Sequence, residues 1–236
     1  MYKRQGIVVA LAALAACFGW IMVASGLVNR PWVNAYKLSI HLCIGISVFS
    51  YLLWAFIKYK HGPDFIISSH RIVSNKLIGW VFGILLVQLF LGGIMSGMKA
   101  ALIYPTWPLI GDSFVPSEVF NVDNWSWTQF REYDRGSFVF SLIHFLHRNV
   151  AYLLTGLMGV YAYRYRVWEL GSRVNVSFVY LLVLVLVQIL LGIFTLLNSV
   201  GYIPVLWGVL HQGVAVLVLG AFLWHLFYVK RTRTLS

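Results

Sequence analysis

Six long apolar runs, separated by polar connections, dominate the pattern of this chain. At a rise of 1.5 Å per residue, each run is long enough to cross about 30 Å of hydrocarbon as a helix. The pattern therefore predicts an all-α fold, a polytopic transmembrane helical bundle with six helices. The predicted helices cover residues 6–27, 36–58, 75–98, 138–163, 175–197 and 206–229.

Composition supports a membrane protein. Of the 236 residues, 60% are hydrophobic and 11% charged, whereas a soluble domain is nearer half apolar and a quarter charged. The net charge of +11 does not indicate nucleic acid as a partner, because the basic residues lie between the apolar runs. Cys17 and Cys43 both fall within apolar runs, so neither a disulfide framework nor a thiolate metal site is expected.

The basic residues predict the orientation of the helices. Twelve of the 18 lie at the two termini and in the second and fourth connections, which the positive-inside rule assigns to the cytoplasm. The long 99–137 connection, with five of the seven acids, then lies on the opposite side. We expect both termini in the cytoplasm and a multi-pass protein of the bacterial inner membrane, with the mitochondrial inner membrane as a less favoured alternative. The twelve basic residues are Lys3, Arg4, Lys58, Lys60, Arg71, Lys76, Arg164, Arg166, Arg173, Lys230, Arg231 and Arg233.

The apolar runs repeat internally. The third run contains VQLFLGGI and the fifth contains VQILLGIF, in matching register, and the first run carries a weaker version, GWIMVASGL. His41 and His211 are each followed by Trp at +13 and Lys at +19. The first two runs are therefore interpreted as a repeat of the last two, with the third and fourth between them.

A symmetric protein with this order would have a further pair of helices before the first run. It would then contain eight helices, arranged as two bundles of four. Residues 1–60 are then the remnant hairpin of an N-terminal bundle, and residues 75–229 a complete four-helix bundle. MYKRQ enters the first helix without signal-peptide features, and its back-translation matches a common sequencing adapter. We expect a truncated chain; the alternative is a short basic native N-terminus.

The histidines are the candidate chemistry. His61 and His70 fall in a basic connection and are expected to be solvated, and His225 is expected to have an interfacial or packing role. His41, His147 and His211 lie about five, nine and five residues into the three helices that run inward, and so at similar depths. Ionisable groups within a membrane are candidates for function.

Two imidazoles that face each other across a bundle can ligate a haem iron. Zinc would require further ligands, and none of the predicted helices contains an acid. We predict His147 and His211 as the axial pair. Arg148 is interpreted as a partner of a haem propionate, with snorkelling as the alternative. His144 is predicted to be a hydrogen-bonding neighbour of the ligand, with direct ligation as the alternative.

Several further features of the sequence bear on the site. His211 and His225 are 14 residues apart, as in cytochromes b with two haems, but Tyr161 stands at the corresponding offset from His147, so a second haem is disfavoured. Gln88 and Gln188 are interpreted as hydrogen-bonding across helices. The aromatic stretch 104–116 is either a cap over the haem edge or a connector. Glycines that allow close helix approach are Gly19, Gly26, Gly92, Gly93 and Gly192.

Four blocks together resemble the haem A synthase family (CtaA/Cox15). They are SGLVNRPWVNAYKLSIHL, GGIMSGMKAALIYPTWPLIGDSFVP, HFLHRNVAY and VLWGVLHQ, in that order. The similarity runs from about residue 6 to 229 and corresponds to the last six of that family's eight helices. His144 stands where the family usually has Gln, and YPTWP replaces its commoner YNTFP, which puts local contacts in doubt.

The resemblance implies the function. The family oxidises the C8 methyl of haem o to a formyl group, making haem a for cytochrome oxidase, with haem b as electron carrier. It implies that His147 and His211 hold haem b and that His41 is one of two histidines for the substrate haem o. The family's catalytic glutamate lies on a helix that this chain lacks, so no catalytic residue is expected here and the chain alone is expected to be inactive.

Membrane lipid, haem O synthase and an unidentified electron acceptor are the expected partners, and a homo-oligomer is left open. One rival reading is a haem b-binding electron-transfer or redox-sensing membrane protein with no haem-modifying chemistry. Another is a transporter or assembly protein with incidental histidines, which would bind no haem.

Overall fold

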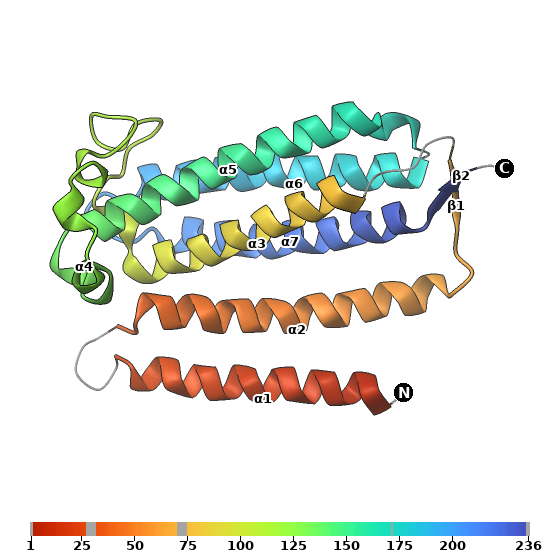
Figure 1. Cartoon of the computed structure of the whole chain (residues 1–236), viewed down its shortest axis with the longest axis horizontal. Coiled ribbons are helices and arrows are strands. Elements are labelled where there is room, and N and C mark those ends of the chain that lie inside the picture. The colour runs from red at the N-terminus through yellow and green to blue at the C-terminus, as the bar shows by residue number, and fades with distance from the viewer. Residues whose placement is uncertain (1, 27–31, 70–74, 171, 235–236) are drawn as a thin grey trace.

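The computed structural model describes residues 2–26, 32–69, 75–170 and 172–234, and it is a bundle of long helices (Figure 1). Each predicted run corresponds to one of these helices, with ends that agree to within four residues. The all-α prediction is confirmed. The long helices are α1 (Tyr2–Ala24), α2 (Ala35–His61), α3 (Asn75–Met98), α5 (Phe138–Tyr165), α6 (Ser172–Leu197) and α7 (Val205–Lys230).

Within the described residues, five of the six long helices are apolar enough by composition to cross a membrane. The exception is α5, which runs beside the others over 28 residues. Its sequence HFLHRN places His144, His147, Arg148 and Asn149 within two turns and lowers the hydropathy. The predicted membrane span over α5 therefore stays a prediction, and a spanning α5 would need its polar groups to be accommodated inside the bundle.

The ends of α2 follow from local sequence. Asn34 precedes the helix, and its Oδ1 accepts hydrogen bonds from the backbone N–H groups of Tyr36 and Lys37 at 3.1 and 3.2 Å. Gly62 follows the helix with φ of +76°, a conformation that glycine adopts without a steric cost. The helix therefore begins and ends where capping residues occur.

Helix α2 packs against α1 on one side and against α3 and α7 on the other (Figure 1). Small residues let α2 and α3 approach closely: a Cβ added at Gly93 would lie 2.7 Å from the Oγ of Ser39. The Ser39 hydroxyl donates to the backbone carbonyl of Phe90 at 2.6 Å. Hairpin α1–α2 is thereby joined to the rest of the bundle. The boundary between residues 1–60 and 75–229 stays a prediction.

Two hydrophobic cores lie at opposite ends of the bundle. One includes buried residues of α3, α5, α6 and α7, among them Met158, Leu181 and Phe222. The other lies beside the long connection and draws its buried residues from α2, α3, α5 and that connection, among them Leu91 and Leu142. The halves of α6 and α7 nearer the long connection thus contribute less to the packed interior than their opposite halves.

The 99–137 connection is folded. It contains α4 (Trp127–Arg131) and four 3₁₀ turns, and the hydroxyl of Tyr133 accepts a hydrogen bond from the backbone N–H of Ala35 at 3.0 Å. The Tyr36 hydroxyl donates to the carbonyl of Phe130. These bonds attach the connection to the start of α2. The four turns are η1 (Ala100–Leu102), η2 (Ser117–Val119), η3 (Val122–Asn124) and η4 (Tyr133–Arg135), and a fifth, η5 (Val167–Glu169), follows α5.

At the opposite end, two short strands pair in parallel, β1 (Ile67–Ser69) and β2 (Thr232–Thr234). They were not predicted, because each is only three residues long. The prediction that His61 is a solvated loop residue is wrong. His61 ends α2 and packs among aromatic rings, with centroids 4.5 Å from Phe65 and 5.2 Å from Phe227. His70 and Arg71 lie outside the described residues.

Candidate functional site

His147 lies on α5 and faces α3. A Cβ added at Gly92 would lie 3.1 Å from Cε1 of the imidazole, a tight contact, so the glycine lets the ring lie close against α3. One turn earlier on α3, the amide nitrogen of Gln88 lies 3.3 Å from Nε2 of His147. A glycine and a glutamine of one helix together hold the imidazole of the other.

His211 on α7 is held in the same way by α6. A Cβ at Gly192 would lie 2.9 Å from Cε1 of the ring, and the amide nitrogen of Gln188 lies 3.4 Å from Nε2. In addition, Nδ1 lies 3.1 Å from the backbone carbonyl of Gln188. Since a carbonyl only accepts, Nδ1 carries the proton and donates, which leaves the lone pair on Nε2.

The structure brings the two predicted ligands together. His147 lies close enough to His211 and to His144 for electrostatic interaction. Within the described residues there is no group of three or more His, Cys, Asp or Glu side chains that could hold a metal ion. A pair of imidazoles is too few for a structural zinc site but sufficient for a haem iron, which takes four ligands from its porphyrin. The donor set therefore fits haem.

His41 occupies the equivalent position on α2, opposite α1. A Cβ at Gly19 would lie 3.1 Å from its Cε1, as at the other two histidines, while its Nδ1 is buried without a hydrogen-bond partner. The residue one turn before Gly19 is Ala15, where the other two sites have glutamine. The glycine that packs against the imidazole thus occurs at all three histidines, whereas the glutamine occurs only at His147 and His211.

Arg148 is buried, with 7% of its surface exposed. Its two terminal nitrogens donate to the backbone carbonyls of Pro108 and Phe114, and the guanidinium lies 5.3 Å from the centre of the Phe114 ring. Nearby, Nε1 of Trp107 donates to the hydroxyl of Tyr152 at 3.1 Å. The 104–116 stretch is thus attached to α5 one residue from His147. These contacts carry no signal in the sequence, and the propionate role of Arg148 stays a prediction.

His144 lies one turn before Arg148, with which it interacts electrostatically, and is only 2% exposed. Its Nδ1 is buried and has no hydrogen-bond partner. The side chain thus borders the site with an unsatisfied nitrogen, and its role as a neighbour of the ligand stays a prediction.

His225 belongs to a separate network. Its Nε2 lies 2.9 Å from the hydroxyl of Tyr161, and its Nδ1 lies 2.9 Å from the Oγ of Ser177. Both ring nitrogens therefore have partners, in line with the packing role expected for it. Ser177 was missed, since a serine in an apolar helix carries no distinctive signal.

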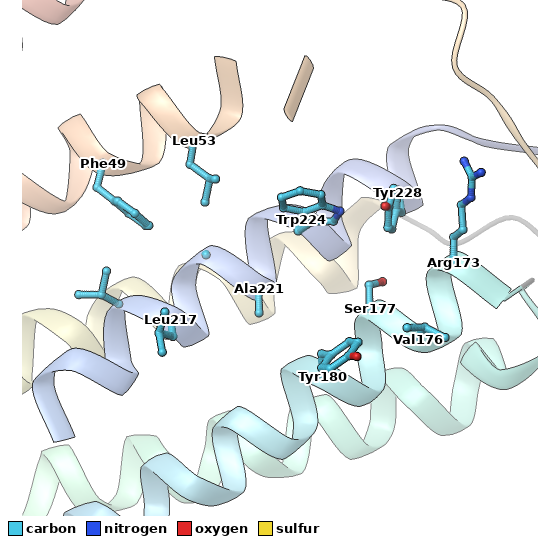
Figure 2. Close-up of a pocket in the computed structure, with 12 residues that line it drawn as sticks. Phe49, Leu53, Arg173, Val176, Ser177, Tyr180, Leu217, Ala221, Trp224 and Tyr228 are labelled. Atoms are coloured by element: carbon cyan, nitrogen blue, oxygen red, sulfur yellow. The ribbon is translucent and has the colours of Figure 1, made fainter. Parts of the chain in front are cut away.

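A cavity of about 600 Å³ lies between α2, α6 and α7 (Figure 2). Its lining is mostly apolar and includes Phe49, Leu217 and Trp224, with Arg173 at one end. None of the four candidate histidines lines it. We base the candidate site on the histidine geometry, because the lining of this cavity is mostly apolar and includes none of these histidines.

The chain matches known proteins over most of its length. Residues 1–223 match the family described as "Cytochrome oxidase assembly protein" (COX15-CtaA). Relatives named "Heme A synthase" include those of Sinorhizobium fredii, 35% identical over 90% of this chain, Flavobacterium psychrophilum, 31% over 92%, and Brucella anthropi, 34% over 92%. The matched region covers 55%, 61% and 57% of these relatives, so the chain spans little more than half of their length. By the match over residues 1–223, the chain belongs to the COX15-CtaA family of cytochrome oxidase assembly proteins.

Proposed function

We propose that this chain is part of a haem A synthase, which oxidises the C8 methyl group of haem o to a formyl group. The haem a formed in this way would serve cytochrome oxidase. The proposal is supported by the names of the relatives and, above all, by the neighbouring pair His147 and His211, each packed against a glycine of an adjacent helix. This pair is the observation on which the proposal depends.

His147 and His211 would hold haem b through its iron. When bound, haem b supplies a one-electron carrier within the membrane. The bond from Nδ1 of His211 to the Gln188 carbonyl orients the ring and directs the Nε2 lone pair away from it, as partner groups of metal-binding histidines do. Apolar side chains on the outer halves of α6 and α7 would provide surface for a porphyrin.

The remaining site residues would serve the periphery of the two haems. We assign Arg148 to a propionate, because a guanidinium keeps further donors when two nitrogens bind loop carbonyls. His144 would border the axial ligand. His41 would bind the substrate haem o from α2.

The cellular setting is proposed from charge. The chain would lie in a bacterial inner membrane with both termini in the cytoplasm, in contact with lipid. Haem O synthase would deliver the substrate, and an electron acceptor of unknown identity would remove the electrons. A homo-oligomer is compatible with this arrangement.

Haem binding is tested by purifying the chain in detergent and recording absorption and pyridine haemochrome spectra. We expect low-spin haem b in the wild type, and its loss in His147→Ala and in His211→Ala, because each removes one axial ligand. His41→Ala is the matched control and should retain the haem b spectrum. Unchanged spectra in both ligand variants would refute the pairing.

Conversion of haem o is tested separately. We expect haem a from the chain joined to the first two helices of the Sinorhizobium fredii relative, and none from the chain alone. A haem b spectrum without haem a in the extended protein would favour the electron-transfer or redox-sensing alternative.

A further inference from the structure

The same three residue types meet at both predicted haem ligands. On α3 and on α6, glutamine precedes glycine by four residues, and the two side chains therefore lie on one face of the helix. In both hairpins the glycine receives the imidazole and the glutamine amide nitrogen lies 3.3–3.4 Å from its Nε2. Two independent copies of the contact argue that the amide has a role at the ligand.

The polarity of the contact is set at His211. Its Nδ1 donates to a backbone carbonyl, so Nε2 has a lone pair and accepts. The amide nitrogen of Gln188 is the donor to that lone pair. An iron atom would need the same lone pair, because a neutral imidazole nitrogen has only one.

We propose that Gln88 and Gln188 are reversible placeholders, whose amides occupy the imidazole lone pairs before haem binds and leave when iron takes them. This inference rests on the proposed function, in which His147 and His211 ligate haem b. The glutamines are positioning residues that act on the ligands.

A placeholder is useful because these imidazoles lie in an apolar bundle. A polar atom buried there without a partner destabilises the protein, so the amide stabilises the chain before haem arrives. The hydrogen bonding of these amides is incomplete, since the Oε1 atoms of both glutamines are buried without a hydrogen-bond partner. A half-satisfied amide is displaced at a smaller cost than a fully bonded one.

The site at His41 lacks this device. Ala15 replaces the glutamine, and an alanine side chain has no donor for the imidazole. In the proposed function, His41 belongs to the haem that must enter and leave as substrate and product. The amides are therefore found at the ligands of the resident haem and not at the residue assigned to the exchanging one.

The test replaces the amide and keeps its volume. Gln88→Met and Gln188→Met are made in the full chain, together with Gln212→Met, an exposed position beside His211, as the control. Haem-free proteins are compared by thermal unfolding and then titrated with haem b, followed by the absorption of low-spin haem. Since the amide lies against Nε2 of the ligand at both sites, either variant alone tests the claim if the other does not accumulate.

We expect each placeholder variant to have a lower Tm without haem and an apparent Kd for haem b about fivefold lower than the wild type, because a competing hydrogen bond is absent. The control should change neither. Weaker or unchanged haem binding in the variants would overturn the placeholder role, since a purely structural amide lowers stability and affinity together. Absence of haem binding by the wild type would instead refute the proposed function, and this inference with it.

Discussion

Arg148 illustrates how a single charged side chain is accommodated in this bundle. The sequence places it next to a predicted ligand, and the structure attaches its guanidinium to two carbonyls of the 104–116 stretch. Hydrogen bonds from a charged donor are stronger than neutral ones. The residue therefore holds the stretch in place whether or not it also contacts a propionate.

Arg148→Gln should release this stretch. We expect the free energy of unfolding to fall by about 2 kcal/mol, since two buried hydrogen bonds from a charged group are lost. Hydrogen exchange over residues 104–116 of the haem-free chain measures the effect without contributions from a propionate. Arg131→Gln is the control, since Arg131 is exposed and paired with Glu132. Equal exchange in the two variants would contradict the anchoring role.

The lowered pKa of Glu118 predicts that the stability of the long connection depends on pH. Burial raises the pKa of its carboxyl group, but hydrogen bonds from Tyr104, at 2.7 Å, and Ser137 outweigh burial and hold the pKa below its ordinary value. A carboxyl group whose pKa is lower in the folded than in the unfolded state stabilises the fold. This stabilisation is fully present when the pH is above the ordinary, unfolded-state pKa. This contribution is lost as the pH falls through the lower, folded value.

The fluorescence of Trp125, whose indole donates to the carbonyl of Val119, should report this acid transition. In Glu118→Gln we expect the transition to disappear, because the neutral amide does not titrate. Asp123→Asn in the same connection should retain the transition. An unchanged acid midpoint in Glu118→Gln would show that another group is responsible.

At the scale of elements, the glycine seats predict which helix contacts matter for the ligands. In Gly192→Ala the new Cβ would lie 2.9 Å from the His211 ring and must displace it. We expect haem b affinity to fall about tenfold, the magnitude typical of disturbing a group that orients a metal ligand. The measurement is a titration with haem b.

Gly83→Ala on α3 is the matched control. A Cβ there meets nothing within 4 Å, so haem affinity should be unchanged and the helix stabilised by about 0.5 kcal/mol. Equal haem affinity of Gly192→Ala and Gly83→Ala would contradict the role of Gly192 in positioning the His211 ring.

The internal repeat is visible in the cavities as well as in the histidine seats. A second cavity lies between α2 and α3. Five of the α2 residues that line it each correspond to an α7 residue, 170 positions later in the sequence, that lines the first cavity. Leu53 of α2 lines the cavity on α7, and Leu223 of α7 lines the one on α2. Helices α2 and α7 are thus related elements. The matched residues are Ile46, Ser47, Ser50, Tyr51 and Trp54 on α2 and Val216, Leu217, Gly220, Ala221 and Trp224 on α7.

At the scale of the whole molecule, the two ends of the bundle differ. The N-terminus, the β1–β2 pair and the C-terminus lie at one end, and the long connection with α4 lies at the other (Figure 1). The proposed topology places the basic residues in the cytoplasm. A reporter protein fused after residue 234 should therefore be found in the cytoplasm. A reporter inserted in residues 120–126 should be active only outside. Reporter activity on the same side for both would overturn the proposed topology.

The number, positions and type of the long helices could be predicted from the sequence. A membrane requires long runs of apolar residues, so the pattern of residues and the helices coincide. The glycines Gly19, Gly92 and Gly192 were also identified as sites of close approach, and each faces a histidine. The ligand roles, the missing hairpin and the electron acceptor stay predictions.

The contacts between distant parts of the chain could not be predicted. The contact of His61 with Phe227, the attachment of Arg148 to Phe114 and the network of His225 depend on which helices lie side by side. Residue periodicity defines the faces of a helix, but it does not state which face meets which partner.

The sequence by itself thus determined the membrane helices and the histidines that could ligate haem, because both depend on local composition and spacing. Only the tertiary structure decided that glutamine amides face these histidines and that the 104–116 stretch is attached to Arg148. Hydrogen bonds of this kind require atoms to lie within about 3.5 Å, and that proximity arises only from the packing of the whole chain.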